Sequence, residues 1–65
     1  MDYAKQIAKR LHNDTSIYEQ AASMDVAIIP NEYGFDIFGK DKKTAQKFED
    51  WLDERIRNMM IMLIE

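Results

Sequence analysis

The stretch that decides the fold is Asp25-Val26-Ala27-Ile28-Ile29-Pro30-Asn31-Glu32-Tyr33-Gly34-Phe35-Asp36-Ile37-Phe38. It opens with a short run rich in β-branched residues, which favours a strand over residues 25–29. Residues 30–34 are typical of a turn, because proline suits the first corner and glycine tolerates a positive φ. The following run, through Phe38, predicts the returning strand. We therefore expect a β-hairpin with a five-residue connection that is closed by a bulge at Gly34.

Alternation along these strands predicts two faces with different surroundings. A two-stranded sheet is not stable alone, so one face must pack against helices. That face would carry Val26, Ile28, Phe35 and Ile37. The opposite face would carry Ala27, Ile29 and Phe38, together with Asp36. If the helices cover only the first face, Ile29 and Phe38 lie in solvent.

Helical patterns precede the hairpin. Apolar residues recur at helical spacing over residues 2–12, with Asp2 in a favourable position in the first turn. Ser16 and Glu19 have the spacing of a capping box, which predicts a second, short helix through about Met24. The competing interpretation is that the second segment is a bent continuation of the first helix.

A long helix follows the hairpin. Residues 42–64 are expected to be helical, with Asp41 or Thr44 as the cap. The apolar stripe of this helix comprises Ala45, Phe48, Trp51, Leu52, Ile56, Met59, Met60 and Leu63. The sequence therefore predicts an α+β fold in which residues 1–65 form one small domain. Its order is helix, short helix, strand, strand and long C-terminal helix, with the hairpin packed against the helices.

The composition excludes several classes of protein. The chain of 65 residues has no cysteine; a secreted domain this small usually needs disulfides, so we expect the protein in the cytoplasm. The first residues lack the order of a secretory signal. No apolar run approaches the roughly 18 residues of a membrane-spanning helix. The net charge of −3 also lacks the basic excess that binding to phosphates normally needs.

The side chains offer no recognisable catalytic or metal site. His12 is the only histidine, so neither a zinc site of the usual spacing nor a serine–histidine pair can be assembled from neighbouring motifs. A domain of this size also rarely encloses a substrate pocket on the order of several hundred Å³. We expect no enzymatic activity, no cofactor and no metal ion.

The end of the chain carries more apolar surface than one helix face can bury. Met59-Met60-Ile61-Met62-Leu63-Ile64 places apolar side chains all round the helix. This excess predicts a small interaction module that acts as a homodimer, an adaptor or an inhibitor of a larger protein, in the manner of small acidic accessory proteins of bacteria and phages. The expected interface residues are Ile29, Phe38, Met59, Met60, Ile61, Met62 and Ile64. The alternative is that one chain covers these side chains itself, or that the last two turns fray.

The first third of the chain resembles the helix-turn-helix of small bacterial DNA-binding domains. Residues 6–11, a short break and residues 16–21 carry the resemblance, and a hairpin after them would match a winged helix. It implies a nucleic-acid-binding regulator whose second helix reads the DNA. That helix would offer Thr15, Ser16, Glu19, Gln20 and Ser23, which include no Lys or Arg for guanine or phosphate. The break also lacks the usual glycine.

Two charged patches give further candidate sites. Cations that could contact an anion or a nucleic acid stand in the first helix and near the start of the last: Lys9, Arg10, Lys40, Lys42, Lys43 and Lys47. Acids surround Trp51 in the last helix: Glu49, Asp50, Asp53 and Glu54. These acids could bind a basic partner or act as a decoy that imitates nucleic acid. The alternative for both patches is a solvated helix surface, with the acids balanced by Lys47, Arg55 and Arg57.

Overall fold

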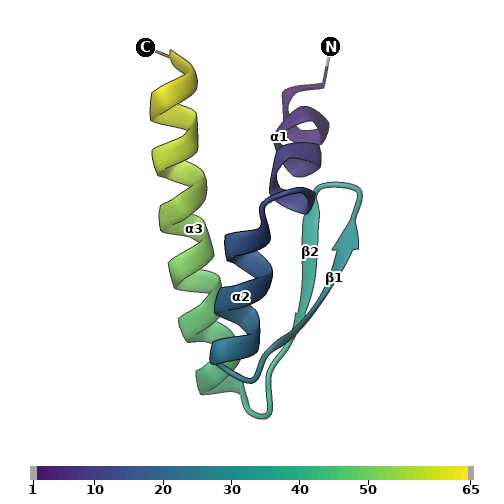
Figure 1. Ribbon diagram of the computed structural model, residues 1–65, viewed down its shortest axis with the longest axis vertical. Coiled ribbons are helices and arrows are strands. Elements are labelled where there is room, and N and C mark those ends of the chain that lie inside the picture. Colours follow the sequence, from purple (N-terminus) through teal and green to yellow (C-terminus); the bar gives the residue numbers. More distant parts are fainter. Residues whose placement is uncertain (1, 65) are drawn as a thin grey trace.

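The computed structural model of the chain describes the backbone of residues 2–64 and the side chains of residues 2–61. The elements follow in the order α1 (Tyr3–His12), α2 (Thr15–Ser23), β1 (Ala27–Asn31), β2 (Gly34–Phe38) and α3 (Lys42–Ile64). This arrangement confirms the predicted α+β fold and the order of its elements. The molecule measures 35 × 21 × 19 Å, and α3 runs along its long axis (Figure 1). Over the described residues, no helix combines the length and the apolar character needed to cross a membrane.

The first two helices are separate, with a break of two residues between them. The carboxylate of Asp14 caps α2, because it accepts hydrogen bonds from the Ser16 amide at 3.1 Å and the Ser16 hydroxyl at 2.6 Å. The predicted capping box at Ser16 is therefore wrong, since the N-cap is Asp14, two residues earlier, and α2 begins at Thr15. An anionic oxygen at this position satisfies a free amide and also interacts favourably with the positive end of the helix dipole.

The chain leaves α2 through a left-handed residue. Asp25 has φ 58°, the amide of Asp25 donates to the carbonyl of Ala22, and the amide of Val26 donates to the carbonyl of Ala21. This pair of bonds is a Schellman motif, which satisfies carbonyls at the helix end and reverses the chain sharply. Because Asp25 belongs to this cap, β1 begins at Ala27 and not at residue 25.

The hairpin is tighter than the sequence predicts. Pairing runs one-to-one from Ala27 opposite Phe38 to Asn31 opposite Gly34, so only residues 32 and 33 connect the strands. The predicted five-residue connection and bulge are therefore wrong. The Asn31 side chain accepts from the Tyr33 amide at 3.0 Å and donates to Asp36 Oδ1 at 2.9 Å. These two bonds stabilise the turn and join the strands beyond Pro30. A proline is tolerated here because β1 is an edge strand.

The core lies between the inner face of the hairpin and the three helices. Its buried residues are Ala8, Leu11, Ile17, Ala21, Val26, Phe48 and Leu52. Ile28, Phe35 and Ile37 are partly buried against this cluster, whereas Ile29 and Phe38 are 54% and 56% exposed. The two faces predicted by alternation are therefore confirmed.

The start of α3 is held close to the end of β2. Asp41 caps α3, since its Oδ1 accepts from the Thr44 amide at 2.7 Å. At Gly39, a Cβ atom would lie only 2.8 Å from the backbone nitrogen of Ala45, so this approach requires glycine. From this connection, α3 and β2 diverge toward the β1–β2 turn (Figure 1).

Candidate partner-binding surface

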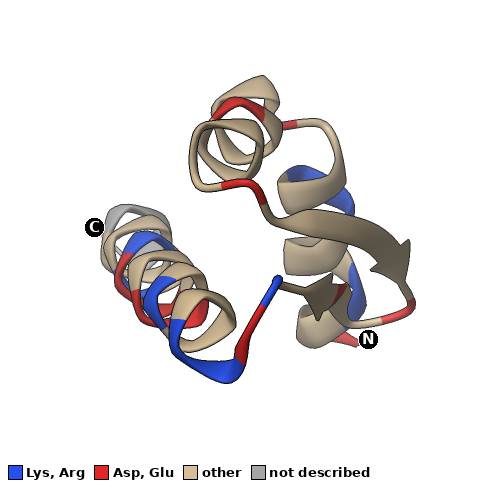
Figure 2. Ribbon diagram, turned by 90° about the horizontal axis from the view of Figure 1, so that it is seen from below, with Lys and Arg blue, Asp and Glu red and all other residues tan. Residues whose placement is uncertain are grey.

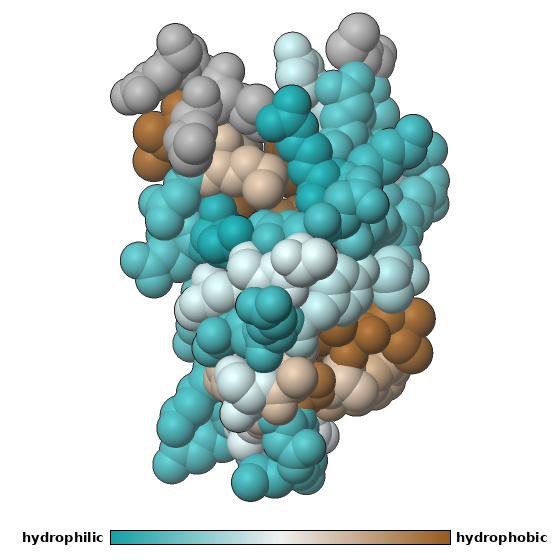
Figure 3. Space-filling model, in the orientation of Figure 1, coloured by the Kyte–Doolittle hydropathy of each residue, from teal (hydrophilic) through white to brown (hydrophobic). Residues whose placement is uncertain are grey.

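The outer face of the hairpin is an apolar surface. We use this name for Ala27, Ile29 and Phe38, which are all exposed. Phe38 pairs with Ala27, and Ile29 pairs with Asp36, so Ile29 and Phe38 are diagonal neighbours on one face. Figure 3 shows hydrophobic surface over β1 at the lower right of the molecule. Ile29 and Phe38 are large apolar side chains that are each more than half exposed, and both stand on this strand pair.

The backbone of β2 has one unpaired edge. A two-residue turn makes Asn31 and Gly34 a hydrogen-bonded pair, and such pairs alternate with non-bonded ones along an antiparallel ladder. The N–H and C=O groups of Phe35 and Ile37 therefore point away from β1, toward α3. In the described part of the chain, these groups have no hydrogen-bond partner. The edge of β1 differs, because Pro30 has no N–H to offer.

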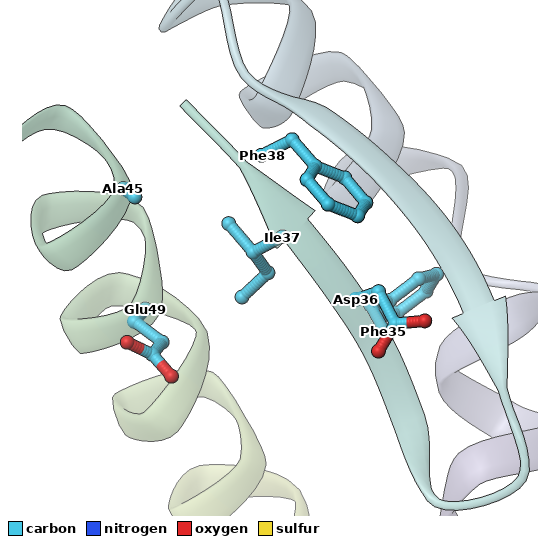
Figure 4. A pocket seen from close by; sticks show the side chains of 6 residues that line it. All are labelled: Phe35, Asp36, Ile37, Phe38, Ala45 and Glu49. Carbon is cyan, nitrogen blue, oxygen red and sulfur yellow. The ribbon is translucent and has the colours of Figure 1, made fainter. Parts of the chain in front are cut away.

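A groove of about 350 Å³ lies between β2 and α3. It is lined by Phe35, Asp36, Ile37, Phe38, Ala45 and Glu49. In Figure 4, Ile37 points across the gap toward α3. The groove therefore combines apolar side chains, an unpaired strand edge and two carboxylates, one from each wall.

A second, shallow hollow of about 520 Å³ lies at the other side of Phe38. Its lining residues are Ala22, Asp25, Val26, Ala27, Phe38, Gly39 and Lys40. Phe38 lines both hollows, and its side chain is 56% exposed.

The acids of α3 remain free of cations. Glu49, Asp50, Asp53 and Glu54 are all exposed, and among the described residues none forms an ion pair. Asp50 accepts a hydrogen bond from Gln46 Nε2 at 2.9 Å. Arg55, expected to balance this patch, pairs with Asp14 instead. The carboxylates therefore present negative charge to the solvent.

The pair of Asp14 and Arg55 has a structural role. Arg55 donates from Nε at 2.9 Å and from Nη2 at 2.6 Å to Asp14 Oδ2, and its guanidinium lies 5.7 Å from the centroid of the Trp51 ring. The pKa of Asp14 is lowered from its ordinary value of 3.8, mainly by the hydrogen bond from the Ser16 side chain and further by Arg55. This contact joins the start of α2 to the middle of α3.

The predicted interface residues at the end of α3 divide into groups. Met59 is half-buried and packs against the core, whereas Met60 and Ile61 are 43% and 56% exposed. Met62 and Ile64 lie outside the residues whose side chains are described. In Figure 3 the apolar area near the end of α3 is separate from the one over β1. The structure therefore does not bring Met60 and Ile61 together with Ile29 and Phe38.

The basic residues also form two separate groups. Lys9 and Arg10 are exposed in the last turn of α1, and the other four lysines, Lys40, Lys42, Lys43 and Lys47, are exposed at the start of α3. Figure 2 shows these groups on different sides of the molecule. The exposed residues of α2 include no cation to join them. The helix-turn-helix resemblance is therefore not accompanied by a continuous basic surface.

His12 ties α1 to the hairpin. Its Nε2 donates to the carbonyl of Gly34 at 2.7 Å, and its ring meets the edge of Phe35 with centroids 5.2 Å apart. Tyr18 packs on Phe35 from another side and donates to the His12 carbonyl at 2.8 Å. The described residues contain no cluster of three His, Cys, Asp or Glu that could hold a metal ion.

Comparison of the chain with protein-family models, with curated proteins and with solved structures gives no significant match to any of them.

Proposed function

We propose that this chain acts without catalysis, by binding another protein chain through the outer face of its hairpin. The observation that carries this proposal is the exposure of Ile29 and Phe38 as diagonal neighbours on a strand pair. A sheet face normally hides such side chains, and contiguous exposed apolar surface often marks an interaction site.

The size of this surface limits the affinity that it can supply. Burying one large apolar side chain completely stabilises by about 1.5–3 kcal/mol. Since Ile29 and Phe38 are each about half exposed, covering both would contribute roughly 1.5–3 kcal/mol. Association costs more than this amount. A partner must therefore make further contacts beyond the outer face.

The charge distribution favours a protein partner over a nucleic acid. The cations of α1 and α3 do not converge, and the exposed acids of α3 would repel phosphates. The same acids attract a basic protein surface. A DNA-binding protein, for which the acids would act as a decoy of nucleic acid, would be one partner of this class.

Two substitutions with matched exposure test the proposal. Phe38→Lys removes a 56% exposed ring from the outer face, and Ile61→Lys removes a side chain of the same exposure from α3. Light scattering from micromolar to millimolar concentration measures self-association, and affinity capture from the source cell measures foreign partners. We expect Phe38→Lys to abolish the association and Ile61→Lys to leave it intact. Loss only in Ile61→Lys, or in neither folded variant, would contradict the proposal.

A further inference from the structure

We propose that the free edge of β2 receives an extended, basic segment of the partner, which adds as a third strand in the groove beside α3. This inference rests on the proposed function, because it supplies the contacts that the outer face lacks. The occupant is a peptide segment in β conformation with Lys or Arg at alternate positions.

The free edge of β2 offers unpaired backbone groups to an added strand. The N–H and C=O groups of Phe35 and Ile37 point toward the groove and have no partner within the described residues. An edge of this kind pairs readily with an added strand. The other edge of the sheet is less suitable, because Pro30 interrupts its donors. The hairpin therefore directs strand addition to β2.

The groove between β2 and α3 has a shape that suits an added strand. A strand added to β2 would lie about 4.8 Å from it. The walls meet where Gly39 touches Ala45, and they diverge toward the β1–β2 turn (Figures 1 and 4). An added strand would therefore enter from the turn end. Its inward side chains would contact Ile37 and α3.

Charge identifies the occupant. Asp36 stands on β2 and Glu49 on the facing side of α3, and both line the groove. The exposed Asp53 follows Glu49 one helical turn later. Cationic side chains at alternate positions of an added strand would lie near these acids, whereas a second copy of the chain would bring its own Asp36 to the same edge. Like charges across a strand pair are destabilising, and each copy has a net charge of −3. A foreign basic segment is therefore favoured over self-pairing.

Nuclear magnetic resonance of the whole chain can test this assignment. The probe is a capped six-residue peptide of alternating Lys and Val, and the control is the same peptide with Glu in place of Lys. When the Lys peptide occupies nine tenths of the chain, exchange of the Phe35 and Ile37 amides should slow roughly tenfold. The amide of Asp36, which already pairs with β1, should change little. The Glu peptide should have no effect.

Charge variants provide the matched test. Glu49→Gln and Asp36→Asn should each weaken binding of the Lys peptide about two- to fivefold. Glu19→Gln removes the same charge from an exposed position of α2, outside the acids of α3, and should leave the affinity unchanged. Equal weakening by Glu49→Gln and Glu19→Gln would overturn the site, since it would indicate attraction to the net charge alone.

Three other outcomes would also overturn the inference: no slowing at Phe35 and Ile37, slowing at β1 instead, or protection of these amides in a dimer without peptide. Strand addition and the proposed function can fail independently. If Phe38→Lys abolishes partner capture while the peptide leaves the edge of β2 unprotected, the outer face binds a partner but strand addition does not occur.

Discussion

The inner and outer faces of the hairpin both carry large apolar side chains, but the two faces have opposite surroundings. Val26, Ile28, Phe35 and Ile37 pack against helices, whereas Ala27, Ile29 and Phe38 do not. Apolar character alone therefore does not decide burial in this molecule. The decision comes from which face the helices can reach, and all three helices contact the strands. A chain of this length has enough helix for one face, and the side chains of the other face are left exposed.

The largest effect should come from the residue against which the inner face packs. Phe48 is fully buried, and Phe48→Ala should lower the free energy of unfolding by about 3–5 kcal/mol. A loss of this size is comparable with the whole stability of so short a chain. Denaturant unfolding followed by circular dichroism measures it. If the alanine variant does not fold, Phe48→Leu provides a smaller cavity, and a wild-type midpoint for that variant would contradict the assignment of Phe48 to the core.

The next effect concerns the connection that places α3 against the hairpin. Gly39→Ala would place a Cβ atom 2.8 Å from the Ala45 nitrogen, so the backbone must move. We expect a loss of about 1–3 kcal/mol, as for other overpacked sites. The control variant Lys40→Ala changes the exposed neighbouring residue, and its free energy of unfolding should lie within about 0.5 kcal/mol of the wild-type value. Equal midpoints for the two variants would indicate that α3 does not need this close approach.

A smaller effect should follow from the contact between Asp14 and Arg55. Asp14→Asn retains a side chain that can cap α2 but removes the ion pair, and should cost about 1 kcal/mol at neutral pH. The pKa of Asp14 is lowered in the folded state, so its contribution is present above the ordinary value of 3.8 and is lost as the pH falls through the folded pKa. The difference in the free energy of unfolding between the wild type and Asp14→Asn should therefore shrink as the pH falls from neutral to below 3.8. Asp50→Asn is the control for charge removal, and a constant difference across this range would exclude the ion pair as the cause.

The division into two faces could be predicted from the sequence because it depends only on alternation. The expected strand began at residue 25 and the observed one begins at Ala27. Where a strand begins does not change the alternation of its side chains, so each side chain lies on its predicted face. The cap of α2 could not be predicted in the same way. Asp14 is held partly by Arg55, which lies 41 positions away, and local motifs carry no sign of that contact.

The groove beside β2 was beyond the sequence for a similar reason. Glu49 was identified as part of an acidic patch, and Asp36 as a residue of the outer face, but their shared groove depends on how α3 packs beside β2. The direction in which the Phe35 and Ile37 amides point depends on the two-residue turn, where a five-residue turn was expected. Such features become visible only when the register and the packing are both known.

The smallest effect on stability should come from substitutions on the outer face itself. Ile29→Thr and Phe38→Thr each leave a β-branched threonine, which suits a strand, at the substituted position, and each should change the free energy of unfolding by no more than about 0.5 kcal/mol. Circular dichroism during denaturant unfolding measures this directly. If either substitution instead costs as much as a core mutation, the outer face already stabilises the isolated chain. A partner would then gain little by covering it, and the proposed binding surface would have to be sought elsewhere.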